Sequence, residues 1–308
     1  MTASKGTRAH LPALGVAALI SLWFVWGTSW PAMRTVFLEL PIWQFRAALC
    51  GVGGLALIGI ALAMKQRVAL PWREVPSLGF VSLLNITGWH VFSGYGLKFM
   101  GAGHAAIICY TMPIWTAIFS VLLLKERMDW RRIAALLLGM CGMAVLMSVD
   151  FNRIGEHPIG ALFMLGAAVT WGLGMVLMKR WTWSPSMIAC AGWQLLLGVI
   201  PILIIAVLTE KFVLDRMSLR ASLASLYLLL VGVVLGYILW FRVVAMLPAT
   251  VGSIGSLMTP VIGVGASALI LGEVVTWREL VALFFVLAAV ALVLLVRPRR
   301  AAAISPAG

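Results

Sequence analysis

Long apolar stretches alternate with short polar segments along the whole chain. Each stretch has about 20 residues with few charges, the length that an α-helix needs to cross the hydrocarbon core of a bilayer. The two-residue alternation of membrane β-strands is absent from the pattern. The chain is therefore predicted to be an all-α membrane protein with ten transmembrane helices, at residues 11–33, 42–64, 75–97, 102–124, 131–149, 158–178, 185–208, 221–242, 247–272 and 278–296.

Part of this pattern occurs twice, at a constant offset of 147 residues. Apolar composition does not explain the matches of Pro113 with Pro260, Glu126 with Glu273, Trp130 with Trp277 and Arg131 with Arg278. Each copy contains five spans, and an odd number places the copies in opposite orientations, as in the inverted repeats of secondary transporters. We predict an N-terminal tail (1–10), two five-helix repeats (11–149 and 158–296) and a C-terminal tail (297–308).

Composition excludes a soluble domain, since 63% of the residues are hydrophobic and 11% are charged. The net charge of +13 comes from Lys and Arg in the short segments between spans, with no basic arm that would indicate nucleic-acid binding. Fifteen of the 23 Lys and Arg fall on one side, which predicts that both termini are cytoplasmic. The four cysteines lie inside apolar runs without a C-x-x-C pair, so we expect neither disulfides nor a metal site.

The repeated unit has Trp-Gly in its first helix and, in its fourth, a proline followed thirteen residues later by glutamate. This pattern resembles the drug/metabolite transporter (DMT) superfamily, EamA type, over nearly the whole chain. The Trp-rich spans also resemble those of the YddG-like aromatic amino acid exporters. The resemblance implies the DMT/EamA fold and a secondary exporter in a bacterial inner membrane, with no enzymatic activity and no cofactor. Lys125 departs from the pattern, because glycine is commoner there, as at Gly272 in the second copy.

Pro113 and Pro260 lie within their spans, where proline removes a backbone donor and kinks a helix. A bend near the membrane midplane lets a half-helix pivot, so we interpret the pair as a gate. The alternative is a static kink, since proline is common in membrane helices. Glu126 and Glu273, at the ends of the same spans, are most simply ion pairs that anchor loops.

Several tryptophans lie deep in the spans, where an indole N–H needs a partner and so tends to face protein or a wet cavity. In the first, third and sixth spans, polar and aromatic residues share one stripe of the helix. Such stripes suit a planar, partly apolar ligand, although helix packing alone would also explain them. The predicted substrate-binding residues are Trp26, Asn85, Trp89, His90, Tyr110, Trp115, Trp171 and Tyr237.

His90 is an ionisable side chain close to mid-span, and such groups are functional candidates in membranes. All ten carboxylates lie in loops or at helix ends, so the chain has no buried acid for proton coupling. We expect a facilitator, with a proton-coupled exporter through His90 as the alternative. Arg46 and Arg242 lie near span ends, where they can snorkel to the interface.

The leading hypothesis is an exporter of aromatic and other apolar amino acids, or similar small metabolites, that works by alternating access. The alternative is a carrier that exports drugs or cationic compounds on the same fold. An intramembrane enzyme lacks a plausible nucleophile–base pair, and without a P-loop ATP is not the direct energy source. The expected partners are a small-molecule substrate and the lipid bilayer, without nucleic acid; the oligomeric state stays open, a monomer included.

Overall fold

The computed structural model describes residues 11–99, 108–146, 158–211, 217–271 and 277–294. Within these ranges the regular structure is entirely helical, without strands. Six of the described helices are long and apolar enough to cross a membrane, and three shorter apolar helices accompany them. The prediction of an all-α membrane protein is confirmed.

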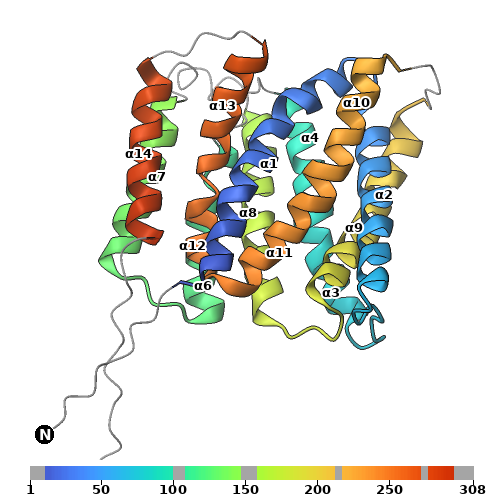
Figure 1. Ribbon diagram of the computed structural model, residues 1–308, viewed down its shortest axis with the longest axis horizontal. Helices are drawn as coiled ribbons and strands as arrows, with labels where there is room; N and C mark the ends of the chain where they lie inside the picture. The colour runs from blue at the N-terminus through green and yellow to red at the C-terminus, as the bar shows by residue number, and fades with distance from the viewer. Residues whose placement is uncertain (1–10, 100–107, 147–157, 212–216, 272–276, 295–308) are drawn as a thin grey trace, which may run out of the picture.

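The helices stand side by side, and their ends lie at two opposite rims of the bundle (Figure 1). The turns after α2, α6 and α8 lie at the lower rim of this view, and the turn after α1 lies at the upper rim. In chain order the elements are α1 (Ala13–Phe37), α2 (Ile42–Ala63), α3 (Val75–Ser82), η1 (Leu83–Gly88), α4 (Trp89–Phe99), α6 (Met112–Leu124), α7 (Trp130–Leu146), α8 (Pro158–Arg180), α9 (Met187–Thr209), α10 (Leu219–Tyr227), η3 (Leu228–Leu235), α11 (Gly236–Met246), α12 (Ala249–Gly255), α13 (Met258–Leu271) and α14 (Trp277–Leu294).

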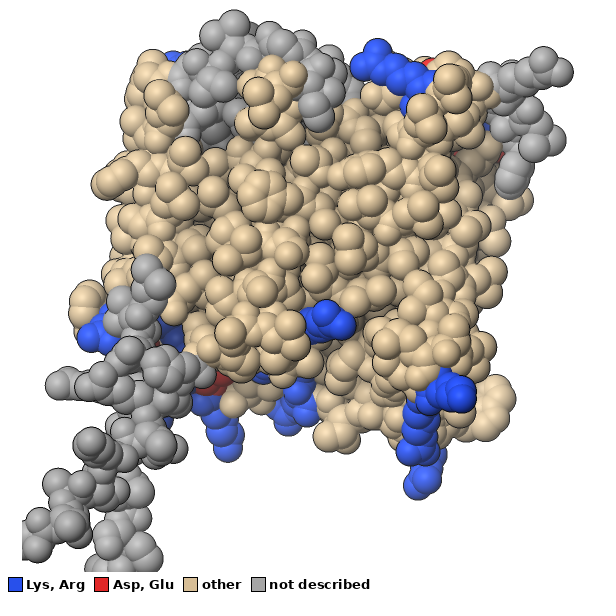
Figure 2. All heavy atoms as spheres, in the orientation of Figure 1, with Lys and Arg blue, Asp and Glu red and all other residues tan. Residues whose placement is uncertain are grey.

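The outer surface suits a lipid environment. Figure 2 shows Lys and Arg side chains at the two rims, with more of them at the lower rim, and a band between the rims that is nearly free of charge. Large apolar side chains are exposed, among them Leu269 (90%), Leu208 (77%) and Phe284 (68%). So much exposed apolar surface would promote aggregation in water, whereas lipid tails cover it without cost.

Glycines allow the helices to approach closely. α2 packs against α9, and a Cβ added at Gly54 or Gly192 would lie 3.1 or 3.0 Å from the other residue's carbonyl oxygen. In the same way, a Cβ at Gly27 in α1 would lie 3.1 Å from the Thr259 carbonyl oxygen in α13. A Cβ at Gly172 in α8 would lie 3.0 Å from the Thr116 backbone nitrogen in α6. Small residues at such crossings drive helix association in membranes, because backbones can then pack in van der Waals contact. The repeated Trp-Gly motif thus marks two tight crossings.

Two of the spans contain a π-helical segment that the sequence did not suggest. The first is η1, between α3 and α4, and the second is η3, between α10 and α11. Their first residues, Leu83 and Leu228, are 145 residues apart, the same offset as Trp26 and Trp171. π-Helical segments are rare and often lie at functional sites.

The sequence suggested that both prolines lie in the middle of continuous helices. The structure places each of them just after a break instead. The chain breaks at Tyr110 and Thr111, and Pro113 lies in the first turn of α6. In the second copy the chain breaks between α12 and α13, just before Pro260. A proline costs no hydrogen bond in the first turn of a helix, because that N–H has no intrahelical partner. The expected kink is therefore a break. Residues 102–107 of the fourth predicted span lie outside the described residues.

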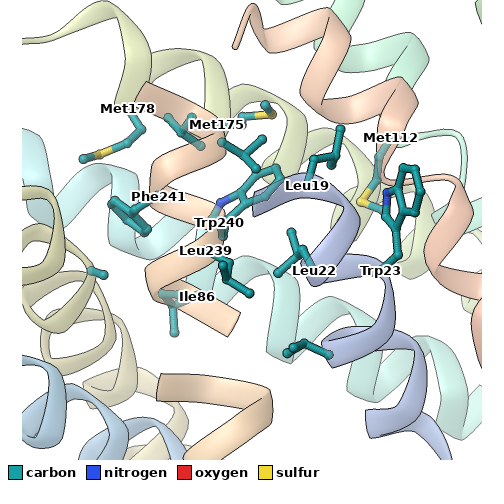
Figure 3. Packing of buried hydrophobic residues seen from close by; sticks show 14 of the residues in the cluster. Leu19, Leu22, Trp23, Ile86, Met112, Met175, Met178, Leu239, Trp240 and Phe241 are labelled. Carbon is teal, nitrogen blue, oxygen red and sulfur yellow. The ribbon is translucent and has the colours of Figure 1, made fainter. Parts of the chain in front are cut away.

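The buried core extends through most of the described helices, and its part between α1, α8 and α11 carries the deep tryptophans. Figure 3 shows Trp240 at its centre, surrounded by Leu19 and Leu22 from α1 and Met175 from α8. Leu19 and Leu22 are completely buried, and Trp240 is 5% exposed. This core holds together the helices that carry the tryptophans described next.

Candidate functional site

Three tryptophans from three helices meet in the interior. The ring of Trp240 lies 5.5 Å from that of Trp26 and 4.8 Å from that of Trp171, both tilted by nearly 40°. Trp26 and Trp171 are the repeated tryptophans of the two copies, and each precedes a glycine at a tight crossing. We call these three residues the tryptophan cluster. Trp240 was not among the predicted site residues, because its ring partners come from two other helices.

The π-helical segment η3 supplies a partner for one indole of the cluster. Trp26 Nε1 donates a hydrogen bond to the carbonyl oxygen of Gly232, over 3.1 Å. Gly236 leaves room for the ring, since a Cβ there would lie 2.5 Å from Trp26 Nε1. The indole N–H is thereby satisfied in the interior, as expected for a tryptophan at this depth.

Asn85 lies in η1 and faces α8 and α9. Its Nδ2 donates to Gln194 Oε1 over 3.4 Å, and Gln194 Nε2 lies 3.1 Å from Met178 Sδ. Asn85 Oδ1 is buried without a hydrogen-bond partner among the described residues. Gly174 is needed opposite this amide, because a Cβ there would lie 2.1 Å from Asn85 Oδ1. A buried acceptor without a partner is uncommon and calls for an explanation, such as a role in the site.

Buried hydroxyl groups lie along the broken helices. Thr116 and Ser120 in α6 and Thr259 in α13 have side-chain oxygens without a partner in the described part of the chain. Gly172 packs next to Thr116, since a Cβ at this glycine would lie 3.2 Å from Thr116 Oγ1. Sequence reasoning passed over these residues, because a threonine in a span usually bonds to the preceding turn of its own helix.

The remaining predicted aromatic residues are distributed around the cluster. Trp115 packs beside Gly172, and its Nε1 donates to Thr111 Oγ1 over 3.3 Å. Tyr110 is buried at the break before α6, Tyr237 stacks on Phe241, and Trp89 packs against the core. Within the described residues no ring contact joins these four to the tryptophan cluster.

His90 faces α2. Its Nε2 lies 3.6 Å from Cys50 Sγ, and its Nδ1 is buried without a partner in the described ranges. Arg46, which donates to the His90 carbonyl, was expected to reach the membrane interface. The structure differs from this expectation, because the Arg46 side chain is buried, with 6% exposure. Arg242, by contrast, is exposed, as predicted.

Several carboxylates at helix ends bind across the chain. Glu126 accepts hydrogen bonds from the Ala249 N–H and the Thr250 hydroxyl, both over 2.9 Å, and pairs with Arg132 at 3.4 Å. The predicted loop anchor is thus mainly a cap on α12, which stabilises the unpaired N–H groups at that helix start. Glu210 caps α2 in the same way, through the N–H groups of Trp43 and Gln44. Glu273 lies outside the described residues.

A second pair of contacts joins two carboxylates to two serines. Glu39 accepts hydrogen bonds from the N–H and hydroxyl groups of Ser218, and Glu74 from those of Ser184. In each case the Ser hydroxyl, followed by the N–H, holds the carboxyl pKa below its ordinary value. The described residues include no group of three His, Cys, Asp or Glu side chains that could hold a metal ion.

Comparisons with known proteins agree with this architecture. The profile of the EamA-like transporter family matches residues 13–148 and again residues 158–295. The uncharacterized transporter YvbV of Bacillus subtilis is 30% identical over 288 residues, which cover 92% of this chain and 93% of that protein. A probable amino-acid metabolite efflux pump of Salmonella typhimurium is 25% identical over 275 residues, 86% of this chain and 89% of that protein.

A solved crystal structure has the same fold. It is 21% identical, has a TM-score of 0.79, and the match covers 91% of this chain and 96% of that one. The family predicted from the repeated Trp-Gly and Pro–Glu patterns is confirmed. The chain belongs to the EamA-like transporter family.

Proposed function

We propose that this transporter exports aromatic and other apolar amino acids, or similar small metabolites, across a bacterial inner membrane. The observation that carries the proposal is the contact of Trp26 and Trp171 with Trp240. Offset rings at 4.5–7 Å attract one another, so a planar substrate can take the place of one ring against another. The relatives named as probable amino-acid metabolite efflux pumps support the same substrate class.

The mechanism that we propose is alternating access between two inverted repeats of five spans each. The support is that equivalent helices have equivalent neighbours: α1 packs against α13, and α8 against α6. The breaks before Pro113 and Pro260 would let α6 and α13, the helices that follow them, move separately from the preceding chain, which is the gate inferred for these prolines. Broken helices near the site are common in secondary transporters.

The proposed orientation has both termini in the cytoplasm. The larger number of Lys and Arg side chains at the lower rim in Figure 2 supports it, through the positive-inside rule. Cysteine labelling tests this in a Cys141→Ser background. Gln66→Cys, between α2 and α3, should react only from the cytoplasmic side, and Lys211→Cys only from outside. The opposite labelling would reverse the proposed topology.

Flux into proteoliposomes tests the substrate class. We expect uptake of labelled phenylalanine or tryptophan and none of a cationic dye, whereas the reverse would favour the carrier for drugs or cationic compounds. Trp171→Leu and Trp240→Leu should reduce this flux at least several-fold, while exposed Trp72→Leu should not. An imposed pH gradient should give no uphill accumulation if the protein is a facilitator. Accumulation that His90→Gln abolishes would instead assign proton coupling to His90.

A further inference from the structure

Arg46 is a buried cation without a counter-ion among the described residues. The side chain projects from α2 and is 6% exposed. Removing an unpaired charge from water costs several kcal/mol, so buried arginines normally pair with a carboxylate. Arg132, for comparison, pairs with the carboxylate of Glu126 at 3.4 Å. Glu210 lies nearby, but its two oxygens accept the backbone N–H groups at the start of α2.

Among the described residues, the groups that contact Arg46 are neutral. Its Nη1 donates to the carbonyl oxygen of His90 over 2.5 Å and to Ser93 Oγ over 3.4 Å. The rings of Phe37 and Trp43 each lie 5.8 Å from the guanidinium carbon. A guanidinium has five N–H donors, and the hydrogen bonds found in the described residues use only Nη1. The fork formed by the remaining donors matches the two oxygens of a carboxylate.

The surroundings would accept an apolar group next to that carboxylate. Trp43 lies 5.4 Å from Tyr95, which in turn lies 5.4 Å from Phe163, so a row of rings continues from Arg46 along α4 and α8. Gly94 makes this arrangement possible, because a Cβ there would lie 2.3 Å from Trp43 and 3.1 Å from Arg46 Nη1. His90 adds a second buried polar atom without a partner, Nδ1.

We propose that Arg46 binds the carboxylate of the transported molecule, which makes the substrates carboxylates with an aromatic or apolar side chain. The inference rests on the proposed function and deepens it, because it adds a contact for the carboxylate end of an amino acid. This contact lies beside rings that make no ring contact with the tryptophan cluster within the described residues. It also predicts that amines or amides of the same shape are poor substrates. A site that contains an unpaired guanidinium repels cations, which disfavours export of cationic compounds.

Competition in proteoliposomes tests the inference. The labelled substrate is phenylalanine, and the competitors are unlabelled phenylalanine, its amide and 3-phenylpropionate. In the wild type, both carboxylates should compete at least tenfold better than the amide, since a charge-assisted bidentate contact is worth roughly that factor. Arg46→Gln should weaken both carboxylates at least tenfold and leave the amide within about twofold. The matched control Arg242→Gln, at an exposed position, should change neither.

A purely structural Arg46 gives a different result. In that case Arg46→Gln would lower transport of acid and amide together and keep their ratio, which would overturn the inference. Equal competition by acid and amide in the wild type would do the same without any variant. If Arg46→Gln does not fold, Arg46→Lys keeps the charge without the fork and should give an intermediate ratio.

The test also separates this inference from the proposed function. The same wild-type proteoliposomes are therefore assayed with labelled 3-phenylpropionate as well. Transport of this acid without transport of amino acids would contradict the proposed function and uphold the role of Arg46. Transport of amino acids without acid-over-amide selectivity would uphold the proposed function and reject the role of Arg46. Transport of a cationic dye alone would reject both.

Discussion

Trp26 donates its indole N–H to the backbone carbonyl of Gly232, so α1 is hydrogen-bonded to the π-helical segment of another span. Trp26→Phe keeps a ring against Trp240 but leaves this carbonyl without its donor. We expect a loss of about 1 kcal/mol in the free energy of unfolding, the typical value of a neutral hydrogen bond. Thermal unfolding in detergent measures it, with Trp72→Phe, at an 88% exposed position, as control. Equal midpoints for the two variants would contradict this role.

The cap that Glu126 provides on α12 should matter more than its ion pair. Glu126→Ala leaves the N–H of Ala249 and the hydroxyl of Thr250 without an acceptor, and we expect a loss of about 2 kcal/mol in stability. Arg132→Gln removes the ion pair and the hydrogen bond from Arg132 to the Arg127 carbonyl, and should cost less than about 1 kcal/mol, as partly exposed pairs do. Chemical denaturation of both variants gives the comparison. Equal losses would mean that the ion pair dominates.

The contact of Glu74 with Ser184 predicts a dependence of stability on pH. The pKa of Glu74 is lower in the folded protein than its ordinary value of 4.5, chiefly because the Ser184 hydroxyl donates to the carboxylate. A lowered pKa contributes stability above pH 4.5, and this is lost as the pH falls from there through the folded-state pKa. Unfolding midpoints between roughly pH 6 and pH 3.5 measure the loss. In Glu74→Gln the unfolding midpoint should fall less over this pH range than in the wild type. An unchanged fall would mean that the pH dependence comes from other groups.

Lys125 ends α6 in the left-handed region, with φ 55° and ψ 31°. Glycine adopts this conformation without steric cost, and the second copy has Gly272 at the matching position. We expect Lys125→Gly to be more stable than Lys125→Ala by about 1 kcal/mol. Both variants lose the same charge, so their difference isolates the backbone. A more stable alanine variant would show that φ is not maintained in solution.

Pro113 offers a separate test of the gate. Because it lies in the first turn of α6, Pro113→Ala should change stability by less than about 0.5 kcal/mol. Transport should nevertheless fall several-fold if the break before α6 has to pivot. Pro201→Ala, inside the continuous helix α9, is the control for proline loss elsewhere. Unchanged flux in Pro113→Ala would leave Pro113 a structural residue.

The sequence predicted the features that depend on composition along the chain. Apolar runs of the right length predicted an all-helical membrane protein, and the repeated Trp-Gly and Pro–Glu patterns predicted the family. The position of Arg46 could not be predicted in this way, because position along a helix gives the depth of a side chain but not the neighbour that it faces. The same limit applies to Trp240, whose partners come from α1 and α8. The π-helical segments depend on contacts between helices, such as Trp26 with Gly232, that no local pattern encodes.

The caps formed by Glu126 and Glu210 have a consequence for how the chain is made. Glu210 belongs to the second half but completes the start of α2 in the first, and Glu126 belongs to the first half but completes α12 in the second. During synthesis the start of α2 therefore stays uncapped until the ribosome has translated Glu210, which follows Trp43 by 167 residues. Neither half can finish its own helices alone. Each of the two segments that match the family profile thus depends on the other to cap one of its helices.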